Sequence, residues 1–281
     1  MPIKKYRPTT NGRRISSVQS FADVTAKRPE KSLTVRRKEF AGRTNGKITV
    51  RHRGGGHKQL YRIVDFLRDK IDIPAVVKSI EYDPVRGARI CLLAYKDGEK
   101  RYMIAPDGIK VSDVIITTKT ADVEMSIGNR LPLARVPLGT IVHAVELEPG
   151  MGAKLARGAG IGIRLMAVEG KYATLKMPSG EVRNVNKQCM ATIGSVSNPD
   201  YRLVRYGKAG RMRHRGIKPT VRGKAMNPID HPHGGGEGRH PIGMKHPKTI
   251  WGKPALGVKT RRKNRISDKL IIERRRNKRR K

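Results

Sequence analysis

Four histidines, the residue type best suited to acid/base or metal chemistry, lie close together at His231, His233, His240 and His246. A neutral imidazole next to the carboxylate of Asp230 is a credible acid/base pair. The His-x-His spacing of His231 and His233 is also one that metal sites use. A run of three glycines and the lack of a neighbouring cysteine argue against zinc. Both chemical interpretations stay open on these residues alone.

The segment around these histidines has a composition that favours a defined loop conformation. Pro228 and Pro232 fix φ, whereas the glycines that follow leave φ free, and this combination predicts a shaped loop rather than a spacer. Asp230 and Glu237 are the only acidic residues between positions 201 and 267. A carboxylate in that setting can pair with arginine, accept from a base amino group, or approach an RNA-bound Mg²⁺ through water.

No hydrophobic segment beside this loop could build the water-excluding pocket that an autonomous enzyme needs. We therefore favour contact with nucleic acid over a chemical role. We predict no catalytic residue, with His231 as the single candidate, and no metal ligand or cofactor of the protein's own. Any metal near the loop would be RNA-bound Mg²⁺ close to Asp230 and Glu237.

A second glycine-rich motif has the sequence Arg51-His52-Arg53-Gly54-Gly55-Gly56-His57-Lys58. Three consecutive glycines cost conformational entropy, so they belong where the backbone turns sharply or approaches another group closely. Between cationic residues, their bare N–H groups can contact phosphate oxygens. A flexible linker is the alternative, but linkers normally alternate Gly with Ser and are not charged on both sides.

A third glycine-rich segment, residues 150–162, superficially resembles the phosphate-binding loops of nucleotide enzymes. It contains neither Gly-Lys followed by Ser or Thr nor Gly-x-Gly-x-x-Gly, so both fingerprints are missing. We interpret it as a connection inside the second β-rich part of the chain, with Lys154 and Arg157 touching phosphate.

Charge is distributed along the chain in three blocks. Residues 1–62 contain 17 Lys/Arg and 3 Asp/Glu, a net of +14, and residues 63–200 contain 19 and 16, a net of +3. Residues 201–281 contain 26 and 4, a net of +22. Self-repulsion opposes compaction of such arms, so we expect them to become ordered mainly against a very negative partner. The phosphate backbone of nucleic acid is the obvious one.

The near-neutral middle of the chain carries a β pattern, with turn signals between short apolar runs and no βαβ pattern. The predicted strands are residues 63–67, 75–82, 88–95, 99–105, 109–116, 140–147, 163–169, 171–177, 181–185 and 188–196. This spacing favours two all-β sandwiches or barrels that meet near Gly128.

The clearest hairpin signal is Asp97-Gly98, because a two-residue loop needs positive φ at both central positions. A two-residue loop there predicts Leu93 opposite Tyr102 and Cys91 opposite Ile104.

The two cysteines, Cys91 and Cys189, have no spacing signature, so we expect buried thiols in a reducing compartment. No segment approaches the ~18 consecutive apolar residues of a membrane span. The first residues lack the apolar run of a secretory signal, and Asp23 and Glu30 argue against a transit peptide. We expect a cytoplasmic protein, with an organelle as the alternative.

Three strings closely resemble the family of the bacterial-type second protein of the large ribosomal subunit. They are Arg-His-Arg-Gly-Gly-Gly-His-Lys at 51–58, Tyr-Lys-Asp-Gly-Glu-Lys-Arg-Tyr at 95–102 and Met-Asn-Pro-Ile-Asp-His-Pro-His-Gly-Gly-Gly-Glu-Gly-Arg at 226–239. The resemblance runs nearly from end to end, and the third string alone is hard to obtain by chance. Relatives tend to carry Ser-Ala-Gly-Thr where this chain has residues 158–162, which loosens any hydroxyl contact there.

The resemblance implies an all-β chain, with an oligonucleotide-binding-type barrel at 63–127 followed by an SH3-like barrel at 128–200. It implies long, basic, irregular extensions at 1–62 and 201–281 that are buried in large-subunit ribosomal RNA. It further implies roles in subunit joining, tRNA binding and support of the peptidyl transferase centre, and His231 matches the histidine of the family's proposed catalytic role.

The predicted partners are large-subunit rRNA, the small subunit at the subunit interface and, indirectly, tRNA, with no membrane and no homo-oligomer. The residues predicted to bind rRNA are Arg51, His52, Arg53, Gly54, Gly55, Gly56, His57, Lys58, Lys154, Arg157, Arg205, Arg211, Arg213, Arg215, Arg222, Asn227, Asp230, His231, His233, Gly234, Gly235, Gly236, Arg239, Arg261, Arg262, Lys263, Arg265, Arg274, Arg275 and Arg276.

Two other function classes remain beside a structural rRNA-binding protein. A general DNA- or RNA-condensing protein would explain the charge but not the shaped loop at 227–241. An enzyme that uses His231 would explain the loop but not the arms.

Overall fold

The computed structural model describes residues 3–37, 42–120, 123–238, 240–262 and 264–275. The chain forms two compact units. The first comprises Met1–Lys38, Lys58–Ala209 and Ile266–Lys281, and the second comprises Glu39–His57 and Gly210–Arg265. This division does not follow residues 62 and 200, because parts of both basic arms pack within the first unit. The predicted domain boundaries stay predictions.

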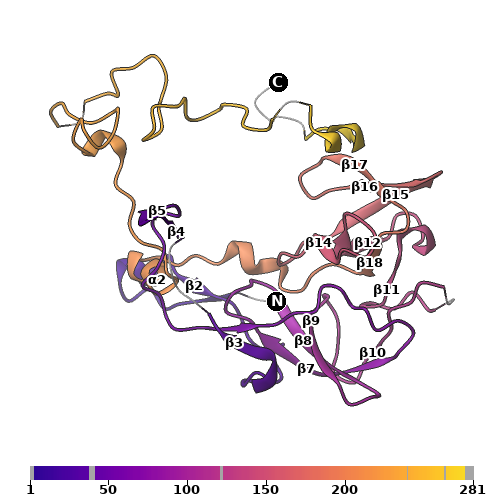
Figure 1. Ribbon diagram of the computed structural model, residues 1–281. Coiled ribbons are helices and arrows are strands. Elements are labelled where there is room, and N and C mark those ends of the chain that lie inside the picture. The colour runs from indigo at the N-terminus through magenta and orange to yellow at the C-terminus, as the bar shows by residue number, and fades with distance from the viewer. Residues whose placement is uncertain (1–2, 38–41, 121–122, 239, 263, 276–281) are drawn as a thin grey trace. The chain divides into compact units, whose positions relative to one another are not determined.

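Two antiparallel sheets form the first unit's frame (Figure 1). The four-stranded sheet has the order β10-β7-β8-β9, with β7 Ala75–Tyr82, β8 Arg89–Tyr95, β9 Lys100–Ile104 and β10 Val114–Ile115. The seven-stranded sheet has the order β11-β18-β12-β15-β16-β17-β19. Its strands are β11 Arg130–Pro132, β12 Ile141–His143, β15 Ile163–Glu169, β16 Tyr172–Lys176, β17 Val182–Asn186, β18 Met190–Ile193 and β19 Ile271–Glu273. The prediction of an all-β fold is confirmed.

The remaining elements are short. Four two-stranded ribbons pair β1 Lys4–Lys5 with β2 Ser17–Val18, β3 Thr34–Arg36 with β6 Leu60–Arg62, β4 Arg43–Thr44 with β5 Lys47–Ile48, and β13 Val145–Glu146 with β14 Ala153–Leu155. The α-helices are α1 Asn11–Arg14 and α2 Ala209–His214. The 3₁₀ turns are η1 Lys31–Leu33, η2 Leu133–Arg135, η3 Pro199–Leu203, η4 Gly223–Ala225 and η5 Ile266–Leu270.

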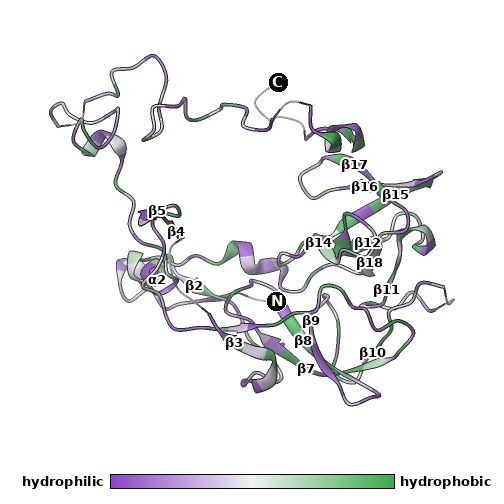
Figure 2. Cartoon of the chain, in the orientation of Figure 1, coloured by the Kyte–Doolittle hydropathy of each residue, from purple (hydrophilic) through white to green (hydrophobic). Residues whose placement is uncertain are grey.

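Strand β8 is apolar along most of its length (Figure 2), and nearly all of its residues are buried. Cys91 and Leu93 belong to a core on one face, with β7 and Ile115. Ile90 and Leu92 belong to a second core on the other face, which Val196 completes from beyond β18. A strand buried on both faces reads as a continuous apolar run rather than as an alternation.

The predicted register of the β8–β9 hairpin is wrong by one residue. Leu92, not Leu93, lies opposite Tyr102, and Cys91 lies opposite Met103. Since side chains alternate between faces, this shift moves Tyr102 to the face that also holds Leu92.

The reason is the length of the loop. The N–H of Tyr95 donates to the carbonyl of Glu99 at 3.0 Å, so the loop has three residues, 96–98, instead of two. Gly98 has φ +85°, which is the left-handed position of a three-residue loop with a bulge. Asp97-Gly98 signals both loop types, and the sequence pattern alone does not separate them.

Several predicted strands are shorter than expected. Residues 63–67 form only an isolated bridge between Val64 and Tyr102, and 109–116 shortens to β10. The run 140–147 breaks into β12 and β13 at Ala144, which has φ +48°, and 188–196 shortens to β18. In contrast, β7 and β15 have the predicted ends.

The N-terminal arm packs on the first sheet, contrary to the expectation that it becomes ordered mainly on a partner. Arg89 is 1% exposed, and its Nε donates to Asp23 at 2.6 Å. The hydroxyl of Tyr102 accepts from the N–H of Glu30 at 2.7 Å, and Lys100 pairs with the carboxylate of Glu30. The two acidic residues in this stretch of the arm therefore hold it to the sheet.

Part of the C-terminal tail also departs from the expectation of an irregular extension. Strand β19 pairs with β17 at the edge of the seven-stranded sheet, with Arg183 opposite Ile271 and Val182 opposite Glu273. The tail thus supplies a short apolar strand, Ile271-Ile272, between its two basic clusters. Backbone pairing with an open sheet edge needs no large apolar face, which explains why composition did not predict it.

Both cysteines are buried and free, as predicted. Burial raises the pKa of the Cys91 thiol far above its usual range, and that of Cys189 to about 12. Neither thiol is therefore a nucleophile at neutral pH.

His143 makes the stability of the first unit depend on pH. Its ring is 1% exposed, Nδ1 donates to the carbonyl of Gly194 at 2.9 Å, and burial lowers its pKa to about 4. The unfolded chain, with an ordinary pKa of about 6.5, binds more protons than the folded chain between pH 6.5 and 4. Stability is therefore complete above pH 6.5 and falls through this window, by about 3 kcal/mol from this residue.

Urea unfolding of the free chain at pH 7 and at pH 4 measures this loss. His143→Gln is expected to remove this part of the pH dependence, whereas the exposed His246→Gln is expected to leave it unchanged. An identical pH dependence in wild type and His143→Gln would contradict the assignment.

Candidate nucleic-acid interface

The first part of the interface is a backbone pairing between residues 51–57 and residues 214–218 within the second unit. The N–H of Gly54 donates to the carbonyl of Gly216 at 2.9 Å, and the N–H of Lys218 donates to the carbonyl of His52 at 3.0 Å. Arg53 and Ile217 form the antiparallel bridge between them. Two basic segments that are far apart in the sequence thus become one surface.

The three glycines serve a turn and a close approach, as predicted, and the linker alternative is wrong. Gly54 has φ +110° and Gly55 has φ +70°. A Cβ on Gly56 would lie 2.7 Å from the nitrogen of Gly216, so only glycine fits. The group approached is the chain's own backbone. Among the described residues, the N–H groups of Gly55 and Gly56 have no protein acceptor, and they remain able to donate to phosphate.

Trp251 is a candidate contact that the sequence argument missed. Its ring is 74% exposed, and the guanidinium of Arg51 lies 5.5 Å from the ring centroid. An exposed aromatic face beside arginine is a stacking platform for a nucleic-acid base. The available signal was that the single tryptophan of the chain lies in its most basic block.

The loop at 227–238 is shaped, as its prolines and glycines predict. The carbonyl of Asn227 accepts from the N–H of His231 at 3.2 Å, and the N–H of Gly234 donates to the carbonyl of His231 at 2.8 Å. A Cβ on Gly234 would run into the carbonyl of Asn227, and Gly235 has φ +84°. Each of these glycines is required by the turn itself.

The acid/base pair considered for His231 and Asp230 is not formed. His231 Nδ1 instead accepts from the backbone N–H of His233 at 3.0 Å, and the carboxylate of Asp230 is exposed. His233 Nε2 accepts from the N–H of Lys248 at 2.9 Å, and the two imidazole centroids lie 4.8 Å apart. Both rings are thus used to hold the loop together.

The described residues contain no group of three His, Cys, Asp or Glu side chains that could hold a metal ion. Glu237 is exposed like Asp230, and neither carboxylate forms a hydrogen bond or ion pair within the described part of the chain. The two carboxylates therefore face solvent beside the loop.

A separate basic site lies in the first unit around Phe66. The guanidinium of Arg157 lies 4.7 Å from its ring centroid and that of Arg86 lies 5.7 Å from it. Arg86 is also held by Asp83 at 2.5 Å and by the hydroxyl of Tyr61 at 3.0 Å. Lys154 is exposed on β14. The sequence indicated Lys154 and Arg157 but not Arg86, because the partner of Arg86, Phe66, is distant in sequence.

The structure places the other predicted residues on the surfaces of both units. Arg211 and Arg213 lie on α2, Arg215 follows it, and Arg205 donates its N–H to Ser17 Oγ at 2.9 Å. Arg222 precedes η4, and Arg261, Arg262, Arg265, Arg274 and Arg275 lie in the tail. The predicted contacts Arg239, Lys263 and Arg276 lie outside the described residues. Lys154 and Arg157 belong to the first unit, and the loop at 227–238 belongs to the second.

None of the helices in the described ranges has the length and apolar character needed to span a bilayer.

Two family models match the chain. Residues 30–117 match the model described as Ribosomal Proteins L2, RNA binding N-terminal domain. Residues 126–252 match the model described as Ribosomal Proteins L2, C-terminal domain. Together the two ranges cover well over half of the chain, and the oligonucleotide-binding and SH3-like barrels of these domains agree with the two sheets.

Proposed function

This chain belongs to the ribosomal protein L2 family, and we propose that, as an RNA-binding structural protein of the large ribosomal subunit, it supports the peptidyl transferase centre and subunit association. The observation that carries the proposal is the surface made by residues 51–57 and 214–218 of the second unit. It is held by backbone bonds of Gly54 and Lys218 and leaves its cationic side chains exposed. Such a surface is suited to fix phosphates rather than to process a substrate.

The second unit supports a scaffold role over a chemical one. The apolar residues Ile229 and Leu256 are 97% and 84% exposed, so the unit has apolar surface that a partner can cover. A condensing protein needs only charge, whereas the loop at 227–238 has a specific backbone path. An enzyme needs an enclosed pocket around His231, and this ring is engaged in the loop's own hydrogen bonds.

The proposal includes the partners that this chain would have in the large ribosomal subunit. Large-subunit rRNA is the main partner, the small subunit is met at the subunit interface, and tRNA is affected indirectly. Mg²⁺ bound to the RNA is approached through water by Asp230 and Glu237, whose carboxylates are exposed. We place the chain in cytoplasmic rather than organellar ribosomes and without a second copy of itself.

Sedimentation of a cell lysate tests the assignment. At low Mg²⁺, where the two subunits separate, the chain is expected to sediment with the large subunit. At high Mg²⁺ it is expected to sediment with the fraction that contains the large subunit. Migration with free DNA, or at the top of the gradient, would contradict it.

His231→Gln tests the scaffold role of the loop. Glutamine keeps a hydrogen-bonding side chain of similar size but does not titrate near neutral pH. Loss of a general base costs about 10²–10⁴-fold in rate, so fully occupied His231→Gln subunits are expected to keep peptide-bond formation within about tenfold. The exposed His246→Gln is the matched control.

Occupancy must be measured, because poor assembly of His231→Gln would imitate lost chemistry. A thousandfold loss in fully occupied subunits, with unchanged chemical probing of the RNA around the loop, would make His231 a catalytic residue and would reject the scaffold role.

A further inference from the structure

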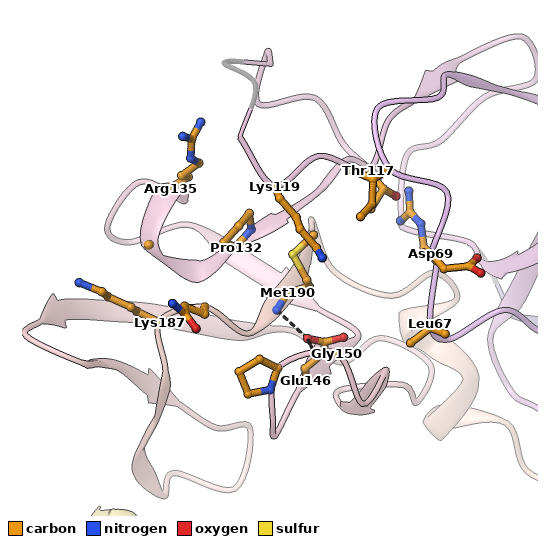
Figure 3. Close-up of a pocket in the computed structure, with 15 residues that line it drawn as sticks. Leu67, Asp69, Thr117, Lys119, Pro132, Arg135, Glu146, Gly150, Lys187 and Met190 are labelled. Atoms are coloured by element: carbon orange, nitrogen blue, oxygen red, sulfur yellow. Dashed lines mark hydrogen bonds between the residues drawn. The ribbon is translucent and has the colours of Figure 1, made fainter.

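A cavity of about 570 Å³ opens beside β11 and β18 of the seven-stranded sheet, within the first unit (Figure 3). Its lining residues come from residues 67–71, from the segment that follows β10, and from η2, β13 and the start of β18. Its volume lies in the range of sites that hold one small organic molecule, about 300–1,000 Å³. It shares no residue with the Arg157–Phe66 site or with the second unit.

The inner wall of this cavity contains a buried cation without a counter-ion. Arg68 is 6% exposed and donates to the carbonyl of Gly128 at 3.0 Å. Among the described residues, no carboxylate lies within 4.0 Å of its guanidinium, and its Nε has no hydrogen-bond partner. Burial and then the charge of Arg130 lower its pKa to about 10. A buried, unpaired charge is costly, and an anion in the cavity would offset that cost.

The two acidic residues of the lining do not supply that anion. The carboxylate of Glu146 is bound by Arg130 at 2.7 Å and by the N–H of Met190 at 3.1 Å. Asp69 is bound by the guanidinium of Arg101. Both acids are therefore already neutralised, and the remaining lining charge is positive.

Two lysines and an apolar wall complete the cavity. Lys119 and Lys187 have no carboxylate partner within the described residues. Figure 3 shows the ammonium of Lys119 directed over Met190 into the cavity, whereas Arg135 points away from it. Leu67 and Pro132 contribute apolar surface on opposite sides. The site thus combines an apolar slot with cations at its back and rim.

We infer that this cavity receives one nucleotide extruded from the bound RNA, with the base against the apolar wall and the phosphate at Lys119. The inference rests on the proposed function for its RNA partner. A nucleotide supplies both an apolar face and a negative charge, which matches the lining. Specific RNA recognition uses unpaired bases that are splayed out of the helix into such pockets.

Photo-cross-linking on the full chain bound to protein-free large-subunit RNA tests this. The photoreactive residue p-benzoylphenylalanine is placed at Gln188, on the cavity rim, and in a second protein at Leu67, on the opposite side. Leu138, which is 63% exposed and outside the lining, is the control position. Both cavity positions are expected to cross-link to the same unpaired nucleotide, and the control position is not.

Lys119→Gln is expected to reduce that cross-link and to lower the salt slope of RNA binding by about 1, whereas Lys110→Gln, on the exposed surface, leaves the cross-link intact. Urea unfolding confirms that each variant is folded. RNA binding without a cavity-specific cross-link, or a cross-link to protein in place of RNA, would overturn the inference while the proposed function stands. Loss of all RNA binding by the wild-type chain would instead reject the proposed function.

Discussion

The affinity of the free chain for large-subunit RNA is expected to fall about 10³–10⁵-fold between 50 and 200 mM salt. Each phosphate neutralised by Lys or Arg releases counterions, and six to ten such contacts give a loss of this size. The two arms hold 17 and 26 Lys/Arg against 3 and 4 Asp/Glu, so most of their cations have no acidic partner in their own block. Filter binding or fluorescence titration at several salt concentrations measures the slope.

A matched pair of variants locates the charge responsible. Arg213, Lys218 and Arg222 are exposed in the second unit, and changing all three to Gln is expected to reduce the slope by about 3. Lys78, Lys110 and Lys176 are exposed on the first unit's strands and loops. Changing these three to Gln removes the same charge and is expected to change the salt slope little. A wild-type slope near 2, or equal effects of both triple variants, would show that the arms are mostly solvated.

Glu146→Gln is expected to destabilise the free chain by about 3–5 kcal/mol, the usual cost of breaking a buried ion pair. Glu146 and Arg130 are each 1% exposed, and Nη2 of Arg130 donates to Glu146 at 2.7 Å. The same carboxylate accepts from the N–H groups of Gly150, Gly152 and Met190 at 3.1–3.2 Å. Removing its charge leaves the buried guanidinium of Arg130 without a counter-ion.

Urea unfolding of wild type and variant measures this cost. Glu148→Gln removes an exposed carboxylate two residues away and is expected to change stability by less than about 0.5 kcal/mol. Arg130→Met combined with Glu146→Gln is expected to recover part of the loss, because the unpaired charge is gone and the glutamine oxygen still accepts from the backbone. Equal effects of Glu146→Gln and Glu148→Gln would show that the pair contributes no more than a surface charge.

Local patterns in the sequence determined the strands and the positions of several turns. The alternation of buried and exposed residues in β7 and β15 depends only on neighbouring residues. The ends of these two strands could therefore be predicted from the sequence. The prolines and glycines at 227–238 likewise determine a shaped loop, since their φ preferences are local. The charge blocks indicate nucleic acid without any structure, since net charge depends on composition alone.

Contacts between distant residues could not be read from these patterns. The glycines at 54–56 predict a close approach, but only the fold shows that Gly216 is the group approached. In the sequence, Arg89 is only a residue near the start of a predicted strand. In the structure it is buried and forms an ion pair with Asp23. In the sequence, Arg86 is only a residue between two predicted strands. In the structure its guanidinium and that of Arg157 both lie close to the ring of Phe66.

The sequence by itself determined that this chain has an all-β middle, basic arms and a shaped histidine loop, because each depends on the conformational preference or charge of residues close together. Only the tertiary structure decided the register of the β8–β9 hairpin, the burial of Arg68 and the pairing of β19 with β17. The register depends on the length of the loop, and the other two depend on contacts between segments that are 60 or more residues apart. A pattern of neighbouring residues does not specify such contacts.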